Sequence, residues 1–318
     1  EVQKKVEEVT EEIKEEIISL SRGVLDKGSR TPLNLQSQII YRTAVSLFRR
    51  HVPVKGYDFV ISSASWYITK GLHKNEICYC HTPPRWLYGY ETSINLQKYW
   101  PVRIYGLIVG HFLRMYDFNQ AQKVRLFLAN SQNVANRIRK FYRKESIVVY
   151  PPVEVKKVKA VKKDYYLIVS RLVGAKGIEM AVTASKKYGF KLKIAGERAG
   201  FARDIPSLGR VSDEEKSKLM AEAKGFLALA RDEDFGITPV ESMMLGTPVI
   251  AFNGGGYKET IIDGKTGVLF ADYSVDGLWK AIQRFENLKF EIRNLKTHAQ
   301  KFSKESFVKK IKEIVANV

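Results

Sequence analysis

The stretch from Gly225 to Phe270 constrains the fold of this 318-residue chain more than any other. It opens with the apolar run GFLALA, passes through the loop RDEDFG, and reaches a second apolar run, TPVIAF, at 247–252. Short, uninterrupted apolar runs are typical of parallel strands that are covered on both faces. A helix fits between the two runs, and Gly246 is placed to end it. We therefore expect consecutive strands of a doubly wound parallel sheet.

The helix between these strands is expected to begin at Thr238. Threonine is a favourable N-cap, Pro239 suits the first helical position, and Glu241 lies three residues after the cap. The loop before the helix leaves the carboxyl end of a strand, which is the edge where open α/β sheets bind ligands. Free N–H groups and the positive end of the helix dipole favour an anion at this place.

Two glutamates bracket the loop in the pattern E-x7-E. Glu233 lies on the loop and Glu241 in the first helical turn, so both can reach one crevice from different elements. A carboxylate accepts two hydrogen bonds from a vicinal diol, and the pair therefore suits a sugar or a ribose. The alternative interpretations are a capping box between Thr238 and Glu241, and a solvated loop acid at Glu233.

Residues 233–270 resemble the nucleotide-sugar loop of family 4 retaining glycosyltransferases, which have the GT-B fold. The elements E, FG, E, G-x-P-V-I-A, GG and ET stand in register along the whole segment. The resemblance implies that Glu233 contacts hydroxyls of the donor sugar and that Glu241 contacts the ribose of the nucleotide. It also implies that backbone amides face the donor at three positions: Phe235, Gly236 and Ile237.

Asp232 and Asp234 flank Glu233, and D-x-D is the metal motif of a different glycosyltransferase fold. The sequence contains no other cluster of metal-ligating residue types, and the resemblance places the loop in a GT-B context. We therefore predict no metal and no cofactor, with a GDP- or UDP-linked sugar as the substrate.

The rest of the second half alternates strands and helices. YYLIVS, KLKIAG and SLGRV, the last at 207–211, are expected strands, and SDEEKSKLMAEA is an expected helix capped by Ser212. Arg171 and Lys176 follow the first of these strands, where cations can hold a diphosphate; an isolated pair with this spacing would be two solvated surface cations. The family has the same RL…KG element, which implies that both cations stabilise the leaving diphosphate. Residues that resemble the lining of the nucleobase are Glu197, Arg210 and Val211.

The first half resembles the same family through YCHTPPR and through NS…VVYPPV. The first of these is similar to a YCHTP-x-R signature of mannosyltransferase-like members. It implies that His81 lies near the donor sugar and the acceptor, and that Arg85 contacts substrate. A single histidine after a strand is otherwise a satisfied structural residue. A full domain of this family opens with a strand and a GG loop, and neither precedes YDFVISS. We expect two helices there instead, at 8–25 and 33–50.

The predicted architecture is α/β and GT-B-like, with two Rossmann-like domains facing a cleft. Residues 1–155 form the acceptor-side domain, which is shortened at its start, and residues 156–300 form the nucleotide-sugar-binding domain. A final helix in 301–318 crosses back to the first domain, as in the family. The chain is long enough to give each domain its own core.

A formal net charge of +19 implies anionic partners. Nucleotide diphosphates and anionic lipid headgroups both qualify, and a lysine-rich solubility coat accounts for part of the excess. No nucleic-acid motif is present and the basic residues are spread along the chain, so we expect no specific nucleic-acid partner. Docking on an anionic membrane is suggested by aromatic and basic residues of the first half: Trp86, Tyr88, Tyr90, Trp100 and Arg103.

Cys78 and Cys80 are expected to project from the same face of one strand, where a disulfide between them is sterically disfavoured. They are interpreted as buried free thiols in a reducing compartment. With no signal peptide or spanning segment in the sequence, we expect a cytoplasmic protein that is peripheral on the inner face of the cell membrane.

Together these features predict a retaining, metal-independent glycosyltransferase. It would move a sugar, with GDP-mannose favoured as donor, to a lipid-linked or glycan acceptor. The alternative is a non-catalytic nucleotide-sugar-binding fragment or degenerate homologue, whose shortened first domain does not build an acceptor site.

Overall fold

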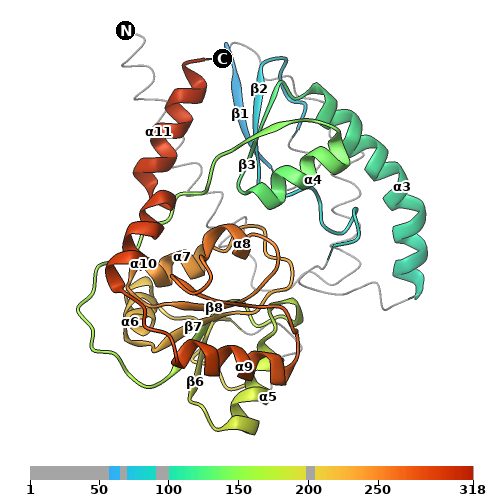
Figure 1. The fold of residues 1–318 in the computed structure, drawn as a ribbon. Coiled ribbons are helices and arrows are strands. Elements are labelled where there is room, and N and C mark those ends of the chain that lie inside the picture. Colours follow the sequence, from blue (N-terminus) through green and yellow to red (C-terminus); the bar gives the residue numbers. More distant parts are fainter. Residues whose placement is uncertain (1–56, 65–69, 91–99, 198–204, 318) are drawn as a thin grey trace.

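A computed structural model of the chain describes residues 57–64, 70–90, 100–197 and 205–317. These residues form two α/β domains, one above the other in Figure 1, each built on a parallel sheet. The helices predicted at 8–25 and 33–50 lie outside the described residues. Within the described residues, no helix combines the length and the apolarity that crossing a bilayer requires.

The first domain is a four-stranded parallel sheet in the order β1-β2-β3-β4. Helix α3 connects β2 to β3 and helix α4 connects β3 to β4, because parallel neighbours need a crossover connection. The elements are β1 (Val60–Ala64), β2 (Glu76–Cys80), α3 (Trp100–Lys123), β3 (Leu126–Ala129), α4 (Gln132–Tyr142) and β4 (Ser146–Val148).

Strand β2 shows how the two faces of this sheet are covered. Cys78 and Cys80 project to one face and join the cluster that α4 completes, where both thiols are buried and free. Burial raises the pKa of Cys80 to about 12. Ile77 and Tyr79 project to the other face, against the last helix of the chain, α11 (Lys304–Val315). The end of the chain therefore packs on the first domain, as the red helix in Figure 1 shows.

The second domain is a five-stranded parallel sheet in the order β6-β5-β7-β8-β9. One face packs against α6, α7 and α10, and the other against α5 and α9, so the sheet is doubly wound as predicted. The strands are β5 (Tyr166–Val169), β6 (Leu192–Ala195), β7 (Gly225–Ala228), β8 (Val249–Phe252) and β9 (Gly267–Phe270). The helices are α5 (Ile178–Tyr188), α6 (Asp213–Glu222), α7 (Ile237–Met244), α8 (Tyr257–Thr260), α9 (Val275–Glu286) and α10 (Ile292–Ala299), with short turns η3 (Gly174–Lys176) and η4 (Gln300–Phe302).

Two local predictions in this domain are wrong. Residues 207–211 are not a strand, although Leu208 N donates to Ile194 O at 2.9 Å along the edge strand β6. Helix α7 begins at Ile237 with Gly236 as its N-cap, so Thr238 is already helical and caps nothing. By contrast, the Ser212 hydroxyl accepts from the N–H of Glu215 and caps α6 as predicted.

Candidate functional site

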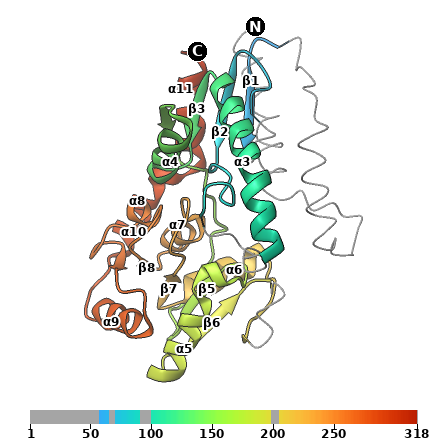
Figure 2. The ribbon, with the colours of Figure 1, turned by 90° about the vertical axis from the view of Figure 1, so that its right-hand side faces the viewer.

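A cavity of about 1250 Å³ lies between the two sheets. His81 and Asn130 reach it from the ends of β2 and β3, and Glu233 and Gly236 reach it from the loop after β7. The carboxyl ends of parallel strands meet at one edge of a sheet, so both domains turn their ligand-binding edge toward this cavity. Figure 2 shows α11 running alongside both domains, and its residue Phe307 contributes to the lining.

The turn that leads into α7 is held against the glycine-rich loop after β8. Gly236 has a φ of 94°, and a Cβ there would lie 2.8 Å from Cε1 of Tyr257. Gly256 N donates to Glu233 O at 2.8 Å. The first residues of α7 consequently line the cavity without a side-chain cap, and the amino end of the helix is available to an anion.

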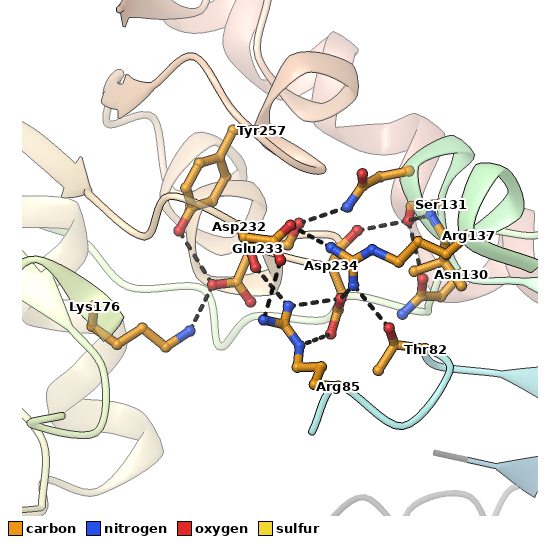
Figure 3. Close-up of polar contacts among 12 residues, drawn as sticks. Thr82, Arg85, Asn130, Ser131, Arg137, Lys176, Asp232, Glu233, Asp234 and Tyr257 are labelled. Atoms are coloured by element: carbon orange, nitrogen blue, oxygen red, sulfur yellow. Dashed lines mark hydrogen bonds and ion pairs between the residues drawn. The ribbon is translucent and has the colours of Figure 1, made fainter. Parts of the chain in front are cut away.

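Glu233 and Lys176 form an ion pair at the wall of the cavity. Nζ of Lys176 lies 2.6 Å from Oε2 of Glu233, and the hydroxyl of Tyr257 lies 3.4 Å from the same oxygen (Figure 3). Burial, together with the Glu233 carboxylate, raises the pKa of the Tyr257 hydroxyl. Arg171 lines the same cavity from the loop after β5. One carboxylate and two cations therefore converge where β5 and β7 end.

Glu241 is nearly buried and has one charged partner. Its Oε1 accepts from Nζ of Lys216 at 2.9 Å, while its Oε2 is buried and bonded to nothing within the described residues. Burial raises the pKa of Glu241, although Lys216 acts in the opposite direction. The Lys216 contact replaces the capping box with Thr238, which does not form. Because Glu241 lines the cavity, its second oxygen is an acceptor that a ligand hydroxyl could satisfy.

His81 lines the same cavity from the first domain. Its Nε2 lies 2.8 Å from the hydroxyl of Ser63, and its ring meets the edge of Tyr79 at 5.3 Å between centroids. Burial lowers the pKa of His81, and the Asp234 carboxylate opposes that effect only in part. The imidazole is therefore neutral at neutral pH and can donate or accept a hydrogen bond in the cavity.

Asp232 and Asp234 turn away from Glu233 and pair with arginines of the first domain. Arg85 Nη2 lies 2.8 Å from Asp234 Oδ1, and Arg137 Nη1 lies 2.5 Å from the same atom. The D-x-D carboxylates thus bridge the two domains (Figure 3). Within the described ranges, no three His, Cys, Asp or Glu side chains form a group that could hold a metal ion.

The structure separates the predicted site residues into two groups. Residues at the cavity are His81, Arg171, Lys176, Glu233, Phe235, Gly236, Ile237 and Glu241. Arg85 is not among its lining residues, because its guanidinium is bound to Asp234 and to Asp232 O. The three residues predicted at the nucleobase also lie outside the lining, on and beside the exposed segment along edge strand β6: Glu197, Arg210 and Val211.

Sequence reasoning missed three residues that shape this site. In the sequence, Arg137 lies in the basic run QNVANRIRKFYR and Lys216 in the charged run SDEEKSKLMAEA, and neither stands out from its charged neighbours. Tyr257 lies in the matched loop, but no sequence signal pointed its hydroxyl at Glu233. Each acts on a residue far from it in the chain, and local patterns do not report such contacts.

Comparison with known proteins agrees with this geometry. Residues 152–306 match the family described as Glycosyl transferases group 1. Sucrose-phosphate synthase from Thermosynechococcus elongatus superposes with a TM-score of 0.66 over 89% of this chain and 76% of that one, at 16% identity. The fold of the chain is GT-B, with two Rossmann-like domains about a cleft.

Curated relatives match over shorter ranges. An uncharacterized glycosyltransferase of Methanocaldococcus jannaschii is 27% identical over 211 residues, which is 62% of this chain and 59% of that protein. The alpha-1,3/1,6-mannosyltransferase ALG2 of Dictyostelium discoideum is 36% identical over 98 residues, which is 31% of this chain and 23% of that protein. The chain thus covers less than two thirds of the length of both relatives.

Proposed function

We propose that the protein is a retaining, metal-independent glycosyltransferase that moves a sugar from a GDP- or UDP-linked donor to a lipid-linked or glycan acceptor. One observation carries this proposal: Glu233, Lys176 and the amino end of α7 meet in a cavity between the two sheets. The group 1 match of the second domain supports it. Similarity to a mannosyltransferase favours mannose as the sugar.

The donor diphosphate is proposed to bind between Arg171, Lys176 and the start of α7. Two cations and a helix dipole offset the charge that builds on the diphosphate as it departs. Lys176 is held by its ion pair with Glu233, and the start of α7 is held by the fold, so both need little reorganisation as the charge develops. The amides near Phe235 and Ile237 act in the same direction.

Recognition of the donor is proposed to rest on the two glutamates. Glu233 accepts hydrogen bonds from hydroxyls of the sugar, and Glu241 uses its unpartnered Oε2 for the ribose. His81 orients the sugar from the opposite domain. The nucleobase role expected for Glu197, Arg210 and Val211 is not part of this proposal, because they lie outside the cavity lining.

Transfer is proposed to follow a front-face path. The acceptor hydroxyl attacks the anomeric carbon on the face that the diphosphate leaves, and its proton passes to the departing phosphate oxygen. The bond from the anomeric carbon to the phosphate breaks as the glycosidic bond forms, and the configuration is retained. Glu233 and His81 then bind and orient the sugar and form no covalent intermediate.

We also propose that the first domain docks on an anionic membrane surface, as a peripheral protein of the inner face. Tyr88 and Tyr90 do not serve this purpose, because Tyr88 stacks on Phe141 at 4.2 Å and Tyr90 lies under the Arg137 guanidinium. Helix α3 exposes apolar side chains instead: Leu107, Phe112, Met115 and Phe118. Sedimentation that does not depend on the anionic lipid content of vesicles would refute this docking.

Calorimetry and turnover across GDP- and UDP-sugars test the donor site. We expect wild type to bind one donor and to hydrolyse or transfer it. Glu233→Ala should lower the affinity for that donor by about 10- to 100-fold, which is the contribution expected of hydrogen bonds to a charged group. Glu145→Ala, which removes an exposed carboxylate of the first domain, is the control and should bind normally. Binding without turnover would indicate a non-catalytic homologue, and no binding of any donor would refute the assignment.

A further inference from the structure

Three consecutive carboxylates leave the loop after β7 in two directions. Glu233 points toward Lys176 in the cavity, whereas Asp232 and Asp234 point toward the first domain (Figure 3). Asp232 lies in a turn and Asp234 in a bend on either side of Glu233. Because the three residues are consecutive, holding both aspartate side chains on the first domain restricts the direction that the glutamate between them can take. The position of Glu233 therefore depends on what holds its neighbours.

Arg85 and Arg137 of the first domain both contact the two aspartates, and the more deeply buried of the two is Arg137. Its side chain is 4% exposed, and its two terminal nitrogens pair with Asp232 Oδ1 and with Asp234 Oδ1. Nη1 also donates to Thr82 Oγ1 at 2.8 Å, and the guanidinium lies 4.3 Å from the centroid of the Tyr90 ring. The planar guanidinium of Arg137 is fixed by its own domain and can thus set the geometry of a loop in the other domain.

Side chains at the amino end of α4 form hydrogen bonds to the backbone of the same loop. Ser131 Oγ donates to Asp234 O at 2.6 Å, and Asn133 Nδ2 donates to Glu233 O at 3.1 Å. The backbone N–H of Asn133 also donates to the Glu259 carboxylate of the second domain at 2.8 Å. Side chains and backbone of the loop are therefore both tied to one helix of the first domain.

We propose that Arg137 is a positioning residue that aims Glu233 at the donor sugar by holding Asp232 and Asp234 across the domain interface. The inference rests on the proposed role of Glu233. It adds that the sugar-binding half of the donor site is complete only while α4 of the first domain is docked on the loop. The nucleotide-binding half needs no such contact, because Glu241 and α7 belong to the second domain.

This division predicts a specific split between binding and turnover. Without Arg137, affinity for a free nucleoside diphosphate should stay unchanged, because its contacts lie within the second domain. Turnover of the nucleotide sugar should fall by roughly 100-fold, the effect of a displacement of about 1 Å at the reacting centre. A purely structural role would lower thermal stability and would weaken both ligands together.

The test compares Arg137→Lys and Arg137→Met with Arg139→Met. Lysine keeps the charge but cannot bridge two carboxylates, and it guards against a methionine variant that fails to fold. Arg139 lies on the same helix, is 64% exposed and pairs with Glu145 of its own domain, so it is the matched control. We expect both Arg137 variants to lose turnover and to keep nucleoside diphosphate affinity, with the control unchanged.

Hydrogen exchange of the amides in 232–237, measured without donor, separates this inference from the donor assignment. Faster exchange in Arg137→Lys than in wild type and Arg139→Met would support the positioning role even if wild type bound no nucleotide sugar. Equal exchange and equal turnover in all three proteins would overturn it. Parallel losses of nucleoside diphosphate binding and turnover would also overturn it, since they would indicate a structural role alone.

Discussion

Replacing Lys216 by methionine should destabilise the protein by an amount that depends on pH. Glu241 is 7% exposed, and Lys216 is its one charged hydrogen-bonding partner within the described residues. Without that partner the carboxylate cannot remain ionised cheaply in its buried place, because an unpaired buried charge costs several kcal/mol. It escapes this cost by taking up a proton.

Protonation sets the upper limit of the effect. Protonating a carboxylate whose usual pKa is 4.5 costs about 3.4 kcal/mol at pH 7 and about 0.7 kcal/mol at pH 5, at 1.36 kcal/mol for each pH unit. In the variant, native Glu241 binds a proton above pH 4.5 that the unfolded chain does not bind. Stability therefore falls as pH rises from 4.5 toward the raised native pKa.

Urea unfolding followed by circular dichroism at pH 5 and pH 7 measures this difference. Lys156→Met is the control, because Lys156 and Glu214 are both exposed and such a pair contributes about 0–1 kcal/mol. The double variant Lys216→Met/Glu241→Gln removes the buried charge and should lose the pH dependence. An equal loss of unfolding free energy in Lys216→Met at pH 5 and pH 7 would refute the reasoning.

Two further predictions concern the cavity. Gly236→Ala should lower the free energy of unfolding by about 2–4 kcal/mol and weaken donor binding, because its Cβ would lie 2.8 Å from the Tyr257 ring at a positive φ. The control Gly189→Ala is also at a positive φ but has open space around it, so it should lose only the part that comes from backbone strain. Equal losses of stability in the two variants on thermal unfolding would show that the clash with Tyr257 does not matter. Burial lowers the pKa of His81, so between that value and 6.5 the unfolded chain binds more protons and stability falls as pH falls. An NMR titration of His81 with a midpoint above 6.5 would contradict this sign, and His81→Asn should remove its share of the slope.

The sequence alone determined the doubly wound sheet of the second domain and the place of its ligand edge. Runs such as GFLALA and TPVIAF predict buried strands because all or nearly all of their residues are apolar. A glycine marks the end of a helix and a serine its start, and both signals depend only on neighbouring residues. Glu233 and Glu241 could be named in advance because they belong to one contiguous pattern. Local signals gave the wrong N-cap for α7. The sequence favoured Thr238, but the helix begins at Ile237 with Gly236, at a φ of 94°, as its N-cap.

Tertiary structure decided which charges meet. Arg137 and Asp232 are 95 residues apart, and Lys216 and Glu241 are 25 apart, so no periodicity or motif links them. Whether a carboxylate serves as a solvated acid, a metal ligand or one half of an interdomain ion pair depends on which partner the packing of two sheets places within about 3 Å of it. The backbone pattern is a property of neighbouring residues, whereas the electrostatics of this site is a property of the closed fold.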